Sequence, residues 1–137
     1  MFSAYPNFGG DCRAAFTRYQ EIFGGELQIV GMGDMPAADQ EGAPEGMDDL
    51  VMNAALTCEH GVIMGSDAPP GTYAPGRAMY LSVSVADAGE AKRVWDALLD
   101  GGEVEMDLAE TFWSPAFGML RDRFGVPWMV NTEAPQT

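Results

Sequence analysis

An internal repeat constrains the fold of this chain more than any other feature of its sequence. Residues 11–23 and residues 87–102 each place apolar side chains along one helical stripe. Each segment opens on an aspartate that can cap a helix, Asp11 or Asp87, and ends at a pair of glycines that stops one. Glu90 stands three residues after Asp87, which is the spacing of a capping box. We therefore predict two helices of the same design.

Strand-like runs surround the two helices in the same order. One extended run precedes each helix and three follow it, with the tripeptides EHG (59–61) and RFG (123–125) as hairpin turns in corresponding places. The chain therefore reads β-α-β-β-β twice. The predicted strands are residues 2–8, 27–32, 50–58 and 62–67 in the first half, and 78–85, 103–112, 116–122 and 126–132 in the second.

This order predicts an α+β fold made of two βαβββ repeats. We expect residues 1–137 to form a single domain of two modules, about 1–67 and 78–133, joined by linker 68–77, which three prolines stiffen. A four-stranded sheet with one helix leaves its other face uncovered. Two such units can therefore curve their mixed sheets around a shared cavity, which is where a ligand would bind.

Composition argues against several classes of partner. With 47% hydrophobic residues the chain can bury a core, and its net charge of −14 makes nucleic acid and anionic membranes poor partners. The sequence has no leader pattern and no apolar run of membrane-spanning length, so we expect a cytoplasmic protein. Much of the acidic charge lies in segment 33–49, which is predicted as a long solvated loop that could serve as a lid or a partner contact.

Few residues are available for metal binding or nucleophilic chemistry. Cys12 and Cys58 lie far apart, and His60 is the only histidine, so a Cys/His zinc site cannot be assembled. A Ser-His-Asp triad is not supported, because this histidine falls in a predicted turn. Both cysteines are expected to be reduced and partly buried, and His60 is expected to be an exposed turn residue. Glycine motifs such as G-x-G-x-x-G are absent.

The repeated unit resembles the vicinal oxygen chelate superfamily, which includes glyoxalase I, extradiol dioxygenases and bleomycin-resistance proteins. The opening YPNFGGDCRAAFTRYQEIFGGE (5–26) and the closing ETFWSPAFGMLRDRFGVPWMVN (110–131) resemble its PhnB-like branch, sometimes labelled 3-demethylubiquinone methyltransferase-like. Glu110 stands where that branch usually has Asp. The resemblance implies the glyoxalase/bleomycin-resistance fold. It does not specify a reaction, because this fold hosts lyases, oxygenases, isomerases and simple binders.

The resemblance also implies where a metal would be held. Metal-dependent members place four ligands on four strands, usually His, Glu, His or Gln, and Glu. The matching positions here fall near Ala4, at Asn53 and Ala55, near Tyr80, and at Met129. Methyl, phenol and thioether groups do not suit hard or borderline divalent ions. We therefore expect no metal at this site and no cofactor.

The same alignment, read with the alternation of strand side chains, gives a set of cavity residues. Their mixture of apolar, aromatic and a few polar groups suits a small, partly apolar organic molecule. A surface ion pair stays open for Arg121, and a core position stays open for Phe117 and Met119, whereas Trp128 is expected in the core. The predicted ligand-binding residues are Asn53, Tyr80, Ser82, Phe117, Met119, Arg121 and Met129.

The sequence thus predicts a PhnB-like protein that binds a small organic molecule without the standard metal, as a sequestering or resistance-type protein does. The first alternative is a lyase or dioxygenase-like enzyme that uses a non-standard or metal-free site, with Tyr80 as an acid or a carbonyl-polarising group. The second alternative is a protein-interaction module that acts through the acidic loop 33–49. A homodimer is the default expectation, since paired units in this fold often complete their cavities across subunits.

Overall fold

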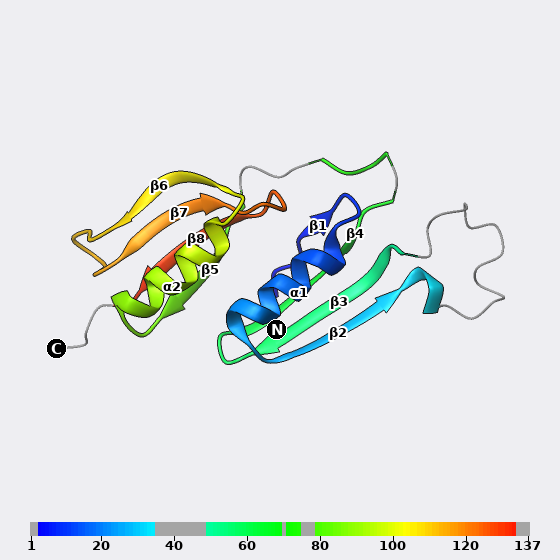
Figure 1. Ribbon diagram of the computed structural model, residues 1–137, viewed down its shortest axis with the longest axis horizontal. Helices are drawn as coiled ribbons and strands as arrows, with labels where there is room; N and C mark the ends of the chain where they lie inside the picture. Colours follow the sequence, from blue (N-terminus) through cyan, green and yellow to red (C-terminus); the bar gives the residue numbers. More distant parts are fainter. Residues whose placement is uncertain (1–2, 35–48, 70, 75–78, 134–137) are drawn as a thin grey trace. The chain divides into compact units, whose positions relative to one another are not determined.

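Two compact units, residues 1–74 and 75–137, make up the computed structural model. Within its described residues each unit holds one α-helix and one four-stranded sheet (Figure 1). The predicted linker 68–77 contains the division between the units. Most of the predicted acidic loop 33–49 lies outside the described residues. The described residues are 3–34, 49–69, 71–74 and 79–133.

The first unit begins with a short strand and then forms helix α1 (Cys12–Phe23), whose buried stripe packs on the sheet. A short 3-10 helix, η1 (Met32–Asp34), follows the second strand. The strands are β1 (Asn7–Phe8), β2 (Glu26–Gly31), β3 (Val51–Cys58) and β4 (Gly61–Asp67).

The second unit repeats this order around helix α2 (Ala88–Leu99). Its strands are β5 (Leu81–Val85), β6 (Glu103–Ala109), β7 (Phe117–Arg121) and β8 (Pro127–Thr132).

The two sheets have the same topology. Their strand orders are β1-β4-β3-β2 and β5-β8-β7-β6. In each sheet the first strand pairs with the last in parallel, and the other pairs are antiparallel. This arrangement confirms the predicted α+β fold with two βαβββ repeats and mixed sheets.

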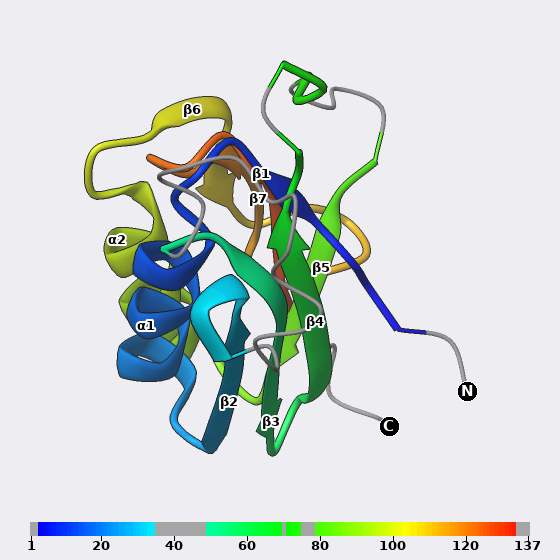
Figure 2. The same cartoon turned by 90° about the vertical axis from the view of Figure 1, so that its right-hand side faces the viewer.

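In the first unit, α1 covers one face of the sheet (Figure 2). Aromatic side chains fill the space between them. Phe8, Phe16 and Tyr19 are fully buried. The ring of Phe16 meets those of Phe8 and Tyr19 edge to face, with centroids 6.0 and 5.7 Å apart. Gly65 makes this close approach possible, because a Cβ at that position would lie 2.8 Å from Phe16 Cε2.

The second unit uses a tryptophan in the corresponding way. Trp95 of α2 packs against Gly118 of β7, where a Cβ would lie 2.6 Å from Trp95 Cζ3. Trp128 is only 1% exposed, which confirms its predicted place in the core. The remaining buried hydrophobic residues of this unit are aliphatic: Val83, Val85, Ala91, Val94, Leu98, Ala116, Leu120, Val126 and Val130.

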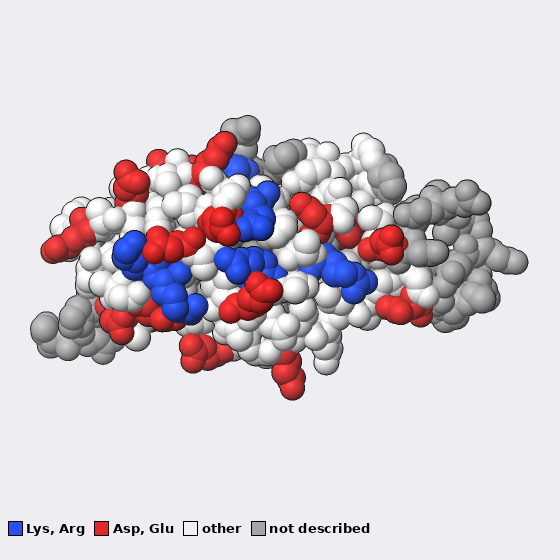
Figure 3. All heavy atoms as spheres, in the orientation of Figure 1, with Lys and Arg blue, Asp and Glu red and all other residues white. Residues whose placement is uncertain are grey.

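Charged side chains on the helices and turns are largely paired. Arg18 contacts Glu21, Lys92 contacts Asp96, and Arg123 contacts Asp100. On the face drawn in Figure 3, Lys and Arg side chains accordingly have Asp and Glu side chains beside them. Exposed pairs of this kind add little stability, so they mainly balance charge locally.

Neither helix of the described chain has the length and hydrophobicity that crossing a bilayer requires.

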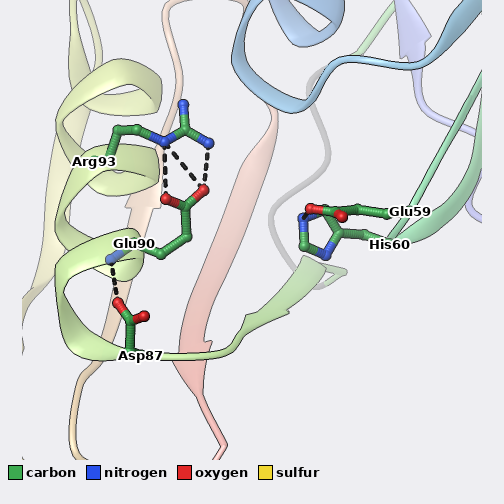
Figure 4. Close-up of polar contacts among 5 residues, drawn as sticks. All are labelled: Glu59, His60, Asp87, Glu90 and Arg93. Atoms are coloured by element: carbon green, nitrogen blue, oxygen red, sulfur yellow. Dashed lines mark hydrogen bonds and ion pairs between the residues drawn. The ribbon is translucent and has the colours of Figure 1, made fainter.

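Helix α2 is capped as the sequence predicted. Asp87 has an extended backbone, and its side chain accepts a hydrogen bond from the Glu90 N–H at 2.8 Å (Figure 4). Glu90 in turn forms an ion pair with Arg93. Capping of this kind satisfies one of the amide groups that a helix leaves without an internal partner.

Helix α1 is capped differently, and the prediction for Asp11 was wrong in this respect. Asp11 occupies the N-cap position, but its side chain makes no capping hydrogen bond, because its φ of −109° and ψ of 19° depart from the extended cap conformation. Asp67 at the end of β4 takes over this role. Its Oδ1 accepts from the N–H groups of Gly10 and Cys12 at 3.0 Å each, and its Oδ2 accepts from Val51 N–H at 2.8 Å.

Both predicted hairpin turns are confirmed. Gly61 and Gly125 have φ values of +125° and +86°, which favour glycine. A carboxylate holds the second turn: Asp122 Oδ1 accepts from Phe124 and Val126 N–H at 2.9 Å each. Its Oδ2 accepts from the indole N–H of Trp128 at 3.0 Å. The spacing of Asp122 and Trp128 in the closing motif therefore has a structural cause in this chain.

Three predicted strands are shorter than expected. In the run 78–85, whose first residue lies outside the described ones, the strand begins at Leu81. The run 2–8 keeps only β1 and an isolated bridge from Ala4 to Ile63, and Pro6 between them has no N–H to donate. The run 103–112 ends at Ala109, because a tight turn closed by Thr111 and Ser114 follows it.

Candidate functional site on the second sheet

The second sheet has one face that α2 covers and one that it does not. Val83, Leu120 and Trp128 point to the α2 side and are buried. Because strand side chains alternate, their neighbours in sequence point to the opposite side, which we call the helix-distal face. Cross-strand pairs such as Ser82 with Met129 lie on this face. Strand pairing places Ser82, Ser84, Phe117, Met119, Arg121, Met129 and Asn131 on this face. Tyr80, directly before β5, and Glu105 join them through side-chain contacts.

The structure brings six of the seven predicted ligand-binding residues onto this face. The seventh, Asn53, lies on β3 of the first sheet, beside Val30 and on the side away from α1. Its grouping with the other six in one cavity stays a prediction, as does ligand binding by all seven. The six residues on the helix-distal face are Tyr80, Ser82, Phe117, Met119, Arg121 and Met129.

A hydrogen bond between Tyr80 and Glu105 links the two edges of the second sheet. Tyr80 directly precedes β5, Glu105 lies in β6, and these are the two edge strands. In a flat four-stranded sheet the edge strands lie about 14 Å apart. The side chains nevertheless meet, with the Tyr80 hydroxyl donating to Glu105 Oε2 at 2.5 Å. They therefore lean toward each other over the two middle strands.

Arg121 completes this polar cluster. Its Nη1 donates to the carbonyl oxygen of Gly125 at 2.9 Å, and its Nη2 lies 3.7 Å from Glu105 Oε1. The ion pair that the sequence left open for Arg121 is present, but the Arg121 side chain is only 16% exposed. The pair is therefore part of the helix-distal face, where screening by water is reduced. We refer to these three residues as the Tyr80–Glu105–Arg121 cluster.

The hydroxyl of Tyr80 is kept protonated by its surroundings. The hydrogen bond to Glu105 raises the pKa of Tyr80 above its ordinary value of 10.0. Desolvation and the negative charge of Glu105 act in the same direction, and the charge of Arg121 opposes them. Tyr80 is therefore a neutral phenol near neutral pH, able to donate one hydrogen bond.

An aromatic group extends from one end of this face. The ring of Phe117 lies 5.6 Å from that of Trp113, which lies 4.8 Å from Phe112. Phe112 is 97% exposed and Trp113 is 49% exposed. Ser114 holds the turn that carries them, since its buried hydroxyl lies 2.8 Å from the Ala116 carbonyl oxygen and 2.9 Å from that of Thr132. Trp113 is thus placed beside the helix-distal face by a well-anchored turn.

The positions that hold a metal in metal-dependent relatives carry unsuitable donors. Ala4 and Ala55 offer only methyl groups, and Met129 offers a thioether. The phenol of Tyr80 is hydrogen-bonded to Glu105. Among the residues that the structure describes, no three His, Cys, Asp or Glu side chains are grouped so that they could hold a metal ion. These donors do not fit a hard divalent ion, and the absence of a metal in the protein itself stays a prediction.

The two cysteines and the histidine lie in the first unit, whereas the helix-distal face belongs to the second. Both cysteines are free thiols, and burial, reinforced by Asp67 and Asp11, raises the pKa of Cys12 to about 12. Cys12 is therefore a poor nucleophile at neutral pH, although it begins a helix. His60 lies in the β3–β4 turn, as expected, with Nε2 3.4 Å from Glu59 Oε1 (Figure 4).

Glu105 is the site residue that the sequence reasoning missed. Its contacts with Tyr80 and Arg121 place its side chain on the helix-distal face. Strand alternation does not place it there, because the register of β6 against β7 skips Glu105 between Val104 and Met106 and shifts again before Ala109. Sequence alternation alone does not give this register. The carboxylate directly opposite Arg121 is Glu103, so cross-strand pairing alone would have pointed to the wrong residue.

Similar proteins share this architecture along nearly their whole length. Protein PA1353 from Pseudomonas aeruginosa has a crystal structure with a TM-score of 0.87, 38% identity, and coverage of 97% of each chain. A glyoxylase/bleomycin resistance protein/dioxygenase domain from Frankia sp. EAN1pec matches at a TM-score of 0.67 over 98% of this chain and 97% of that one. At 15% identity that second likeness concerns the fold alone. The fold is therefore that of the glyoxalase and bleomycin-resistance proteins.

Sequence comparison narrows this class to one family. Protein YjdN of Escherichia coli K12 is 37% identical over 141 residues, which cover 98% of this chain and 96% of that protein. The family model described as 3-demethylubiquinone-9 3-methyltransferase matches residues 4–131. The chain belongs to this family, the PhnB-like branch of the vicinal oxygen chelate superfamily, and the resemblance seen in its opening and closing segments is confirmed.

Proposed function

We propose that this protein binds a small, partly apolar organic molecule on the helix-distal face of the second sheet, without the metal of metal-dependent relatives. The observation that carries the proposal is the Tyr80–Glu105–Arg121 cluster beside half-buried Phe117 and Met129. Apolar surface with a few fixed polar groups is the usual composition of a small-molecule site. The apolar part supplies binding free energy, and the polar cluster selects the ligand.

The activity in the family's description is not part of this proposal. The sequence contains no G-x-G-x-x-G loop of the kind that cradles a nucleotide cofactor. A metal-free enzyme is the second candidate, because the Tyr80 phenol is held neutral beside Glu105 and can donate to a substrate carbonyl. Turnover of a bound ligand, abolished in Tyr80→Phe, would distinguish this candidate from a binder.

A homodimer in the cytoplasm belongs to the proposal as well. Strand β6 is an edge strand, and most of its residues are exposed, including Val104 and Met106 at 44% each. Exposed apolar residues on an unpaired edge favour association. Light scattering after size exclusion at micromolar protein should give twice the mass of the 14.7 kDa chain, and a strict monomer would contradict this part.

The proposed site is tested by a ligand-stabilisation screen. A compound library is added to purified protein, and a true ligand raises the melting temperature by mass action. Hits are then checked by NMR on protein labelled at the methionine methyl groups, since Met119 and Met129 lie on the helix-distal face. The expected result is a shift of these two resonances that weakens in Tyr80→Phe.

Elemental analysis of the same protein tests the metal-free part. Stoichiometric zinc, nickel or manganese that is lost from Met129→Ala would contradict it. Hits that leave the Met119 and Met129 signals unchanged would remove the ligand site from this face.

A further inference from the structure

The Tyr80–Glu105–Arg121 cluster already binds a carboxylate, and that carboxylate belongs to the protein itself. The hydroxyl of Tyr80 donates to Glu105 Oε2 at 2.5 Å, and Nη2 of Arg121 lies 3.7 Å from Oε1. The two oxygens of one carboxylate thus face one neutral and one cationic donor. Hydroxyl and guanidinium donors of this kind are well suited to recognising carboxylate groups in general.

Within this cluster, the side chain of Arg121 is more strongly anchored than that of Glu105. Arg121 lies in the middle strand β7, and Nη1 donates to the Gly125 carbonyl oxygen at 2.9 Å in the adjoining turn. Glu105 lies in edge strand β6, whose pairing with β7 is irregular on either side of Met106. The Glu105 side chain is also twice as exposed as that of Arg121, 32% against 16%. Glu105 is therefore the partner that can leave.

Apolar side chains lie next to this carboxylate position. Met119 follows Arg121 on the same face of β7, two residues back along the strand, and pairs with Met129 of β8. Phe117 continues the row and contacts Trp113. A molecule whose carboxylate met Tyr80 and Arg121 could place its apolar part along this row.

We propose that Glu105 occupies an anion site that serves a small organic carboxylate with an apolar body, and that such a ligand binds by displacing Glu105 from Tyr80 and Arg121. The inference rests on the proposed function and names the ligand class of that site. Glu105 acts as an internal competitor: its charge neutralises Arg121 in the free protein and sets the affinity that a ligand must exceed. In a protein with a net charge of −14, this neutralisation also limits unselective anion binding.

The test compares carboxylates with their amides in two matched variants. Glu105→Gln keeps the side-chain length and an acceptor for Tyr80 but removes the charge that competes for Arg121. Asp107→Asn removes one charge from the same exposed strand and serves as the control. The probes are 3-phenylpropionate and hexanoate, each beside its amide, titrated by NMR of the Met119 and Met129 methyl groups.

The expected result is a gain in affinity that is specific to one variant and one charge state. Glu105→Gln should bind the carboxylates at least about tenfold more tightly than the native protein. Its affinity for the amides should change by less than about twofold, and Asp107→Asn should behave like the native protein. Adding Arg121→Gln to Glu105→Gln should abolish the gain.

The outcomes separate the two proposals. Equal carboxylate-to-amide ratios in Glu105→Gln and Asp107→Asn would overturn the carboxylate inference, while amide binding at the methionines would leave the general binding function standing. If neither carboxylates nor amides move these resonances in any variant, even at millimolar concentration, this face binds neither ligand class and both proposals fail.

Discussion

The two sheets have the same strand order, yet their helix-distal faces carry different chemistry. On the first sheet, Asn53 and Ala55 share the face away from α1 with the apolar side chains of Val30 and Met64. On the second, the corresponding face carries aromatic and thioether groups and the Tyr80–Glu105–Arg121 cluster. The repeated backbone pattern therefore sets the topology, whereas the candidate site is concentrated in one copy.

The same contrast extends to how each unit is held together. A carboxylate in each unit gathers three N–H donors, but Asp67 does so at a helix start and Asp122 does so at a hairpin turn. Each unit thus has one polar residue whose loss exposes several backbone groups. The mutations that follow test whether these two residues carry comparable weight.

The largest expected effect is at the turn of the second unit. Asp122 is 5% exposed, and Asp122→Ala leaves two buried or half-buried amides and the Trp128 indole without their acceptor. The free energy of unfolding should fall by about 4 kcal/mol, measured by urea denaturation. A carboxylate in the hairpin turn of the first unit serves as the comparison: Glu59→Ala should cost less than about 0.5 kcal/mol, because the Glu59 side chain is 81% exposed. If Asp122→Ala and Glu59→Ala lowered the free energy of unfolding by similar amounts, the two turns would not differ in how much a carboxylate stabilises them.

The next effect concerns the two helix caps. Asp67→Ala should lower the free energy of unfolding by about 3 kcal/mol, because three backbone N–H groups lose a charged acceptor. Asp87→Ala removes one such bond and should cost about 1 kcal/mol. Both are measured by urea denaturation under the same conditions. An Asp67 variant no less stable than the Asp87 variant would show that the long-range cap has little weight.

A smaller effect is expected at the two strand glycines that contact aromatic rings of the helices. Gly118→Ala and Gly65→Ala should each cost about 2 kcal/mol, because the new methyl group overlaps Trp95 or Phe16. Combining Gly118→Ala with Trp95→Phe should cost less than the sum of the two single changes, since the smaller ring makes room. Strict additivity in thermal unfolding would mean that the strand, and not the ring, accommodates the methyl group.

The smallest effect is a titration that involves only the second unit. Tyr80 should ionise above pH 10.0, and Glu105→Ala should return its pKa toward that ordinary value by removing both the hydrogen bond and the charge. Because the folded state favours the neutral phenol, the stabilisation is present below the unfolded pKa and is lost as pH rises through the raised folded pKa. Phenolate absorbance, with Tyr80→Phe subtracted, gives the titration. An unchanged pKa in Glu105→Ala would contradict the assigned cause.

Local patterns in the sequence predicted the fold well. The two helical stripes and the strand runs gave the βαβββ repeat, and the Asp87 spacing gave the correct cap. Trp128 was placed in the core because it alternates with Met129. Each of these features depends on neighbours within a few residues, which is the range over which periodicity and capping rules act.

The features that could not be predicted depend on contacts between distant segments. Asp67 caps a helix that starts 55 residues earlier in the chain, and no spacing rule connects them. Glu105 reaches Tyr80 across a sheet whose register shifts at Met106. The candidate site was therefore found in part, through its strand faces, while the carboxylate at its centre required the three-dimensional pairing.

The position of Asp67 has a consequence for synthesis of the chain. A protein emerges from the ribosome N-terminus first, so α1 is made long before the residue that caps it. The hydrogen bonds that start this helix span 57 and 55 residues, whereas the cap of α2 spans three. The first helix therefore gains its side-chain cap only after β4 has emerged, whereas the cap of the second is present as soon as that helix is made. Although the two copies share one architecture, their helices are capped at different stages of synthesis.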